Sequence, residues 1–116
     1  MTDFIALCGR RPEPRDTATA LLAAGPGFGV DRAAHGALLR ILAEDDRPLV
    51  VVEGPLLVQV PGEPARLLGP ELAGLPAPVW WVEARAEWGG ERAAGAARRF
   101  ATELAARTGG VVWPCR

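Results

Sequence analysis

Residues 79–88 read VWWVEARAEW, and the alternation of side chains in this stretch predicts a strand with two unlike faces. One face would be apolar and would carry Trp80, Val82, Ala84, Ala86 and Trp88. The other face would be mostly charged and would carry Val79, Trp81, Glu83, Arg85 and Glu87. The stretch therefore predicts a sheet whose two faces meet different surroundings.

A long helix is predicted directly after this strand. Gly89-Gly90 interrupts the strand pattern, and residues 91–107 then show apolar side chains at helical spacing. The apolar stripe comprises Ala93, Ala97, Phe100, Ala101 and Leu104. We therefore expect this helix to cover one face of the sheet and to leave the other face open to water or to a partner.

Shorter patterns predict the remaining elements. Apolar runs indicate strands over residues 4–8, 49–52, 56–60 and 111–113. Gly54-Pro55 separates two of these runs and predicts a bulge or an edge position. Residues 31–46 fit a helix as well as a strand, and the turn-like run from 44 to 48 favours a strand over 37–43.

A first helix is predicted over residues 16–24. Asp16 or Thr17 would cap its start, and Leu21 and Leu22 would be its apolar residues. Gly25 stands where a left-handed residue commonly ends a helix.

The predicted order of elements is β-α-β-β-(β)-β-α-β. It indicates one α+β domain spanning residues 1–116, with a mixed or antiparallel sheet of about five strands. The two main helices would pack on one face, in a ferredoxin-like arrangement or a related sandwich.

Composition argues against several classes of partner. The net charge is −1, which gives no basic surface for nucleic acid, and no apolar run approaches the roughly 20 residues of a membrane span. All 13 positive charges are arginines, a bias typical of GC-rich bacterial genomes such as those of actinobacteria rather than a phosphate-binding signature. We expect a cytoplasmic protein that needs no cofactor and binds neither nucleic acid nor membranes.

Residues for catalysis or metal binding are scarce. The chain has no Ser and a single His, so a thiol enzyme would have to pair Cys8 or Cys115 with His35. Cys8 lies in an apolar strand, where a buried, inert thiol is the usual outcome. Structural zinc needs about four Cys or His ligands, so we expect no catalytic residue and no metal site. If the first and last strands are neighbours, Cys8 and Cys115 would be close, although reduced thiols are expected in the cytoplasm.

Three segments resemble anion or cation sites. Gly-rich residues 25–29 follow a helix and not a strand, so they lack the context of a phosphate-binding loop. Arg10 and Arg11 are better placed for an anion, between the first strand and the first helix, although solvated loop charges explain them more simply. The acidic run of residues 44–46 is likewise better explained as a solvated turn than as a metal site.

The open face of the strand over residues 79–88 is the best candidate for function. Its Trp81, Glu83, Arg85 and Glu87 would be joined by Glu53 or Gln59 from the neighbouring strand. A Trp and an Arg among carboxylates are typical of interface hot spots. The alternative is a solvated face on which neighbours shield Trp81.

Two stretches carry a family resemblance. Residues 48–63, PLVVVEGPLLVQVPGE, and residues 78–85, PVWWVEAR, resemble an uncharacterised family of actinobacterial proteins associated with type VII secretion gene clusters. The last helix with the Gly-Gly-Val-Val of residues 109–112 is similar to small immunity proteins that neutralise toxins. With the open face, these resemblances imply a non-enzymatic protein-binding module, accessory to a secretion system or acting as an immunity protein. A small cysteine-dependent enzyme and a structural homodimer are the alternatives.

Overall fold

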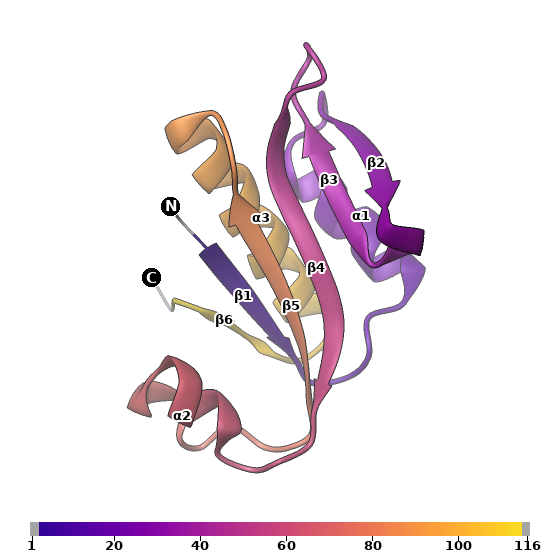
Figure 1. Ribbon diagram of the computed structural model, residues 1–116. Coiled ribbons are helices and arrows are strands. Elements are labelled where there is room, and N and C mark those ends of the chain that lie inside the picture. The colour runs from indigo at the N-terminus through magenta and orange to yellow at the C-terminus, as the bar shows by residue number, and fades with distance from the viewer. Residues whose placement is uncertain (1–2, 115–116) are drawn as a thin grey trace.

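The computed structural model describes residues 3–114, apart from the side chain of His35, and has six strands and three α-helices around one sheet (Figure 1). In chain order the elements are β1 (Asp3–Cys8), α1 (Pro14–Ala24), β2 (Gly29–Ala33), the 3₁₀ turn η1 (Ala34–Gly36), β3 (Leu38–Leu42), β4 (Pro48–Val58), α2 (Glu63–Leu68), the 3₁₀ turn η2 (Pro70–Leu72), β5 (Val79–Ala86), α3 (Gly90–Arg107) and β6 (Val111–Trp113). Within residues 3–114, no helix combines the length and the apolar character that a membrane crossing requires. The predicted α+β class is confirmed.

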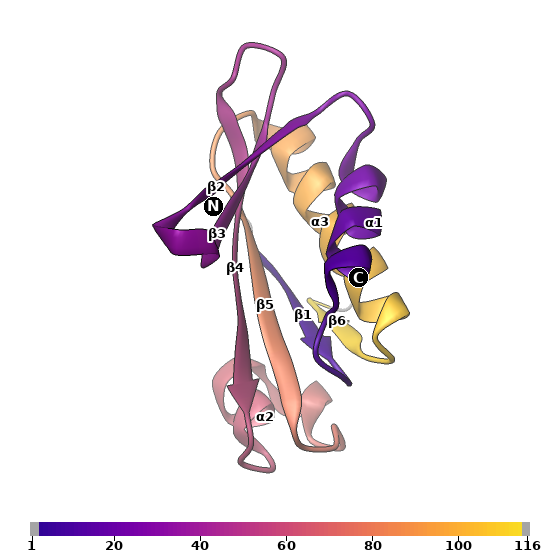
Figure 2. The ribbon, with the colours of Figure 1, turned by 90° about the vertical axis from the view of Figure 1, so that its right-hand side faces the viewer.

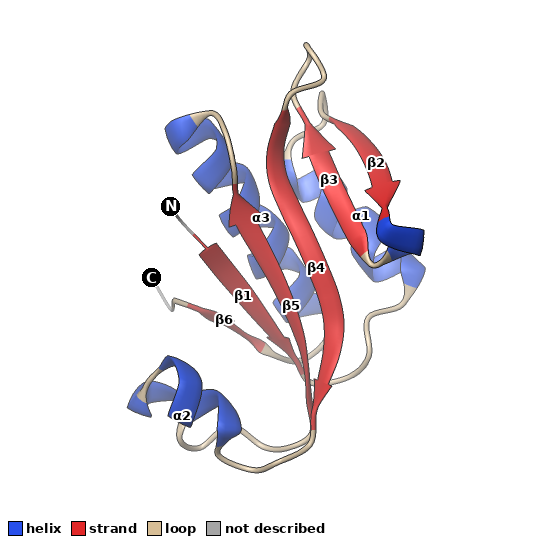
Figure 3. Cartoon of the chain, in the orientation of Figure 1, coloured by secondary structure: helices blue, strands red, loops and turns tan. Residues whose placement is uncertain are grey.

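The sheet is antiparallel throughout and has the strand order β2-β3-β4-β5-β1-β6 (Figure 3). Part of the chain follows the β-α-β-β-α-β order of a ferredoxin-like sandwich. The elements in this order are β1, α1, β4, β5, α3 and β6. The hairpin of β2 and β3 is added at the outer edge of β4. The predicted strand over residues 37–43 is confirmed as β3, and β1 and β6 are indeed neighbours. The prediction missed β2.

Helices α1 and α3 lie on one side of the sheet, which we call the helix face (Figure 2). Every member of the predicted apolar stripe of α3 is buried there, including Phe100 and Leu104 at 1% exposure. The alanines of the stripe allow the helix to approach β1, β4 and β5 closely. Burial of one Phe or Leu side chain contributes about 1.5–3 kcal/mol, so this seam is the main apolar core.

The opposite side of the sheet, which we call the outer face, is partly covered. The segment from α2 to residue 75 contributes Leu72, which is buried, and packs Ala65, Leu68 and Leu75 beside it. These side chains form a second, smaller core with five residues of the sheet: Ile5, Leu7, Val79, Trp81 and Trp113. The prediction of a wholly open second face is therefore wrong at this end of the sheet and holds only for the part beyond the segment.

Two of the apolar residues assigned to predicted elements are exposed. β5 ends at Ala86, so Trp88 lies beyond the apolar face and is 45% exposed, with the Arg47 guanidinium 4.5 Å from its ring centroid. Leu22 is 68% exposed because α1 turns Ala20 and Ala24 toward the core instead.

The ends of α1 also differ from the prediction. The helix begins at Pro14, a favoured first helical residue, with Glu13 in the capping position. Asp16 occupies the third helical position, where its Oδ2 accepts a hydrogen bond from the Glu13 N–H at 2.8 Å. Gly25 follows the helix in an extended conformation and not in the expected left-handed one.

Gly54 and Pro55 form the predicted bulge of β4. The register of β4 against β5 shifts between Glu53 and Leu56, and Gly54 has φ +121°. A Cβ atom at Gly54 would lie 2.7 Å from the Trp81 carbonyl oxygen, so a side chain does not fit there. β3 pairs with β4 only as far as Glu53. Among the described residues, the end of β4 from Leu56 to Val58 therefore has β5 on one side and no strand on the other.

We predict that Gly110→Ala destabilises the fold, because a Cβ atom at Gly110 would overlap the carbonyl group of Leu7 where β6 joins β1. Overpacking of this kind costs about 1–3 kcal/mol of unfolding free energy. Gly27→Ala is the matched control, since nothing lies within 4 Å of a Cβ atom at Gly27. Urea denaturation of both variants tests the contact, and equal unfolding free energies would contradict it.

Candidate functional site

The predicted charged residues of β5 lie together on the outer face, around Arg85. The Nη2 atom of Arg85 lies 2.9 Å from Oε1 of Glu53 on β4, and its Nε atom lies 3.1 Å from Oε2 of Glu87 just beyond β5. Glu83 stands opposite Glu53 in the ladder. Arg85 therefore holds carboxylates from two chain segments in one row, which we call the charged row: Glu53, Glu83, Arg85 and Glu87.

Trp81 lies at the end of the charged row and borders a groove. The indole is half-buried against the second core, and the groove has a volume of about 450 Å³. Its walls come from the end of β4, from the following loop and from α2, and include Leu56, Gln59, Val60 and Leu67. Leu56, Val60 and Leu67 are 63%, 62% and 53% exposed. We call this set, with Trp81, the tryptophan groove.

The concentration of apolar surface here is unusual. Seven large apolar residues are exposed among those described, and three of them line the tryptophan groove. A soluble protein normally scatters such residues singly, and clustering marks a contact surface. Sequence alternation missed Leu56 because it shares one apolar run with Leu57, and only the pairing of β4 with β5 separates their faces. Val60 and Leu67 lie beyond β4, in the following loop and in α2, where strand alternation does not apply.

The charged row has an excess of negative charge. Glu83 is half-buried beside Asp3 of β1. Asp3 stands opposite Arg85 in the pairing of β1 with β5. Partial burial raises the pKa of the Glu83 carboxyl, and the Asp3 carboxylate raises it further. One guanidinium thus faces four carboxyl groups, which favours a basic group approaching from outside.

Cys8 lies inside the core of the helix face. Its side chain has no solvent exposure, and burial raises the pKa of the thiol above its usual value. Two strands, β4 and β5, separate β1 from the β2–β3 hairpin that carries His35 in η1. At about 4.8 Å between neighbouring strands, the backbones of β1 and β3 are about 14 Å apart. The side chain of His35 is outside the described part of the structure, so the Cys8–His35 pair stays a prediction. Cys115, and with it the second thiol pair and the disulfide, lies outside the described residues.

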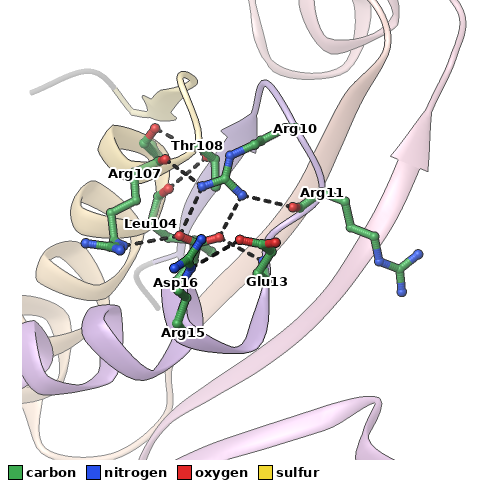
Figure 4. Close-up of polar contacts among 9 residues, drawn as sticks. Arg10, Arg11, Glu13, Arg15, Asp16, Leu104, Arg107 and Thr108 are labelled. Carbon is green, nitrogen blue, oxygen red and sulfur yellow. Dashed lines mark hydrogen bonds and ion pairs between the residues drawn. The ribbon is translucent and has the colours of Figure 1, made fainter.

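Arg10 is occupied by an ion pair with a buried carboxylate and is not available for an external anion (Figure 4). Its Nη1 and Nη2 atoms lie 2.7 Å and 3.1 Å from the two carboxylate oxygens of Asp16, which has no solvent exposure. The Nε atom of Arg107 of α3 donates a hydrogen bond of 3.2 Å to Oδ1 of the same carboxylate. The Arg10 guanidinium holds the pKa of Asp16 far below its usual range.

The acidic run of residues 44–46 is also accounted for by internal contacts. The Glu44 carboxylate pairs with the guanidinium of Arg92 of α3. The Oδ2 atom of Asp45 lies 3.4 Å from Nε of Arg47. Within the part of the chain that the structure describes, no three potential ligands come together as they would around a metal ion.

Comparison of the chain with protein-family models, with curated proteins and with solved structures finds no significant match.

We predict that Glu83→Gln stabilises the protein at neutral pH. Because the folded-state pKa of Glu83 is raised, the folded protein binds more protons than the unfolded chain above pH about 4.3. Glu83 therefore lowers stability as the pH rises through its folded pKa, and a neutral amide avoids this loss. The variant should melt a few degrees higher than the wild type at pH 7.5, with the difference shrinking toward pH 4.

Thermal melts at both pH values test this prediction, with Glu87→Gln as the control because Glu87 accepts a hydrogen bond from Arg85. A Glu83→Gln variant no more stable than the wild type at pH 7.5 would contradict the proposed environment of Glu83.

Proposed function

We propose that this chain is a protein-binding module whose partner docks on the outer face, over the tryptophan groove and the charged row. One observation carries the proposal: Leu56, Val60 and Leu67, each more than half exposed, gather beside Trp81 at the end of the charged row. An aromatic centre with apolar neighbours and a charged border is the composition of an interface hot spot.

The apolar part of the surface is large enough to matter energetically. Covering three side chains of this size would contribute on the order of 5 kcal/mol before the cost of association is subtracted. The half-buried indole of Trp81 is already held by the second core, so a partner would meet a rigid aromatic wall. Rigid anchors of this kind lose little conformational entropy on binding.

The chemistry of the surface specifies the chemistry of the partner. A segment with an apolar side chain fits the groove, and a neighbouring Arg or Lys fits the excess of carboxylates in the charged row. The end of β4 from Leu56 to Val58 has one unpaired edge among the described residues, which favours an extended segment that adds main-chain hydrogen bonds. We therefore propose an extended, basic and apolar segment of another protein as the occupant.

The same charges disfavour self-pairing through this face. A two-fold axis through the charged row would place the carboxylates of one copy against those of the other, and like charges in contact are repulsive. The two roles suggested by the sequence, an accessory factor of a secretion system and a toxin-neutralising immunity protein, both act by binding another protein. The proposed surface serves either role, with a secretion component or a toxin as partner.

The experiment compares two equally exposed leucines. Leu56→Arg places a charge in the tryptophan groove, whereas Leu22→Arg places the same charge on α1, away from the groove; the two leucines are 63% and 68% exposed. Tagged wild type and both variants are used to capture partners from a lysate of the native host, and any captured protein is then titrated in purified form.

We expect the wild type and Leu22→Arg to bind one stoichiometric protein, and Leu56→Arg to bind it at least tenfold more weakly. Binding of that protein should also weaken with rising salt, because the charged row contributes. Equal binding by both variants would overturn the choice of surface, and the absence of any stoichiometric partner would overturn the function. Trp81→Ala is a poorer test, because Trp81 also packs in the second core and its truncation would destabilise the fold.

A further inference from the structure

A second hollow lies on the other side of the sheet, between α1 and the β2–β3 hairpin. α3 packs on β1, β4 and β5, and α1 packs on α3, so the helices cover the hairpin only in part. Ile41 of β3 is buried in the core of the helix face, whereas Leu39 is half-buried. The resulting cleft has a volume of about 380 Å³, within the range of small-molecule sites at roughly 300–1,000 Å³. It shares no residue with the tryptophan groove.

The floor of the cleft is apolar. It is formed by side chains from the sheet and from both helices: Leu21, Leu39, Val52, Val82, Phe100 and Leu104. Phe100 and Leu104 are core residues that present only an edge here, whereas Leu21 and Leu39 are half-buried. The floor therefore offers a fixed apolar surface on which a hydrocarbon or aromatic group can lie.

The rim of the cleft is positively charged. Arg11 comes from the loop after β1, and Arg32 comes from β2 on the opposite side of the cleft. Eight other arginines of the described residues pair with carboxylates, and Arg99 donates to the carbonyl of Ala24. Only Arg11, Arg32 and Arg98 have no hydrogen-bond acceptor for their guanidinium groups within residues 3–114, and two of these three line the cleft.

Arg11 is held in place without being neutralised. Its side chain points away from the Asp16 ion pair (Figure 4), and its guanidinium carbon lies 5.3 Å from the centroid of the Trp80 ring. Stacking on an aromatic ring orients a guanidinium while leaving its N–H groups free to donate. Among the described residues that line the cleft, Glu13 has the one carboxylate, and its Oε1 atom already lies 3.3 Å from Nε of Arg15. The rim thus has a net positive charge above an apolar floor.

We propose that this cleft binds a small organic carboxylate whose apolar body lies on the floor and whose carboxylate is held by Arg11 and Arg32. The occupant follows from the charge and the shape together. A bare inorganic anion would leave the apolar floor exposed, and a neutral apolar molecule would leave both guanidinium groups unpaired. The planar fork of Arg suits a carboxylate in particular.

Octanoate and phenylacetate are suitable probes, and octanamide and phenylacetamide differ from them only in lacking the charge. Titrations followed by calorimetry and by backbone amide resonances should show saturable binding of the carboxylates. The shifted resonances should include Thr17 and Leu39, which line the cleft. The amides should bind at least tenfold more weakly. Absence of saturable binding, or equal binding of acid and amide, would overturn the proposal.

Substitutions locate the site. Arg11→Gln and Arg32→Gln should each weaken carboxylate binding about tenfold, the loss of a charge-assisted contact. Arg98→Gln is the matched control, because Arg98 also has no carboxylate partner within residues 3–114. Arg98 is on α3, where its guanidinium lies over the ring of Phe4 of β1, outside the cleft. Leu21→Trp should block the cleft and abolish carboxylate binding. Its circular dichroism spectrum should remain that of the folded protein. An Arg98→Gln variant as defective as Arg11→Gln, or unchanged binding by Leu21→Trp, would show that the carboxylate binds elsewhere.

Discussion

The arrangement of the helices depends on the ion pairing of one buried carboxylate, that of Asp16. A fully desolvated charge must be paired, and Asp16 is paired by Arg10 from the loop after β1 and by Arg107 from the end of α3. The carboxylate also accepts the Glu13 N–H at the start of α1. Three chain segments thus meet at one group. This junction fixes α1 against α3 and leaves part of the β2–β3 hairpin uncovered, with Arg11 projecting beside the resulting cleft.

The sheet separates two surfaces of opposite character. On the outer face, the alternation of β5 leads from Trp81 to the charged row, where carboxyl groups outnumber Arg85. On the helix face, the guanidinium groups of Arg11 and Arg32, which have no carboxylate partner in the described part of the chain, border an apolar floor. A basic protein segment and a small carboxylate are therefore complementary to different sides of the same sheet. With a net charge of −1, this polarity arises from placement and not from composition.

Patterns that depend on near neighbours in sequence predicted the fold well. The alternation over Val79–Ala86 assigned faces correctly, and helical spacing identified the stripe from Ala93 to Leu104. Pro14 also carried a usable signal, since proline favours the first position of a helix, and it would have placed Asp16 inside the helix instead of at its cap. Contacts between segments that are distant in sequence could not be predicted from such local patterns. The cover of the outer face by α2 and η2 and the exposure of Leu56, Val60 and Leu67 depend on how β4 and its following loop meet β5.

Site-specific photocrosslinking in the native host tests the central claim that the outer face is the docking surface most directly. A photoreactive residue at Val60 would lie in the tryptophan groove, and the same residue at Val30 would lie on β2 at the far edge of the sheet; these valines are 62% and 46% exposed. The account predicts a crosslink to one other protein from Val60 and none to that protein from Val30. A crosslink from Val30 alone, or a product from Val60 that contains only a second copy of this chain, would contradict it.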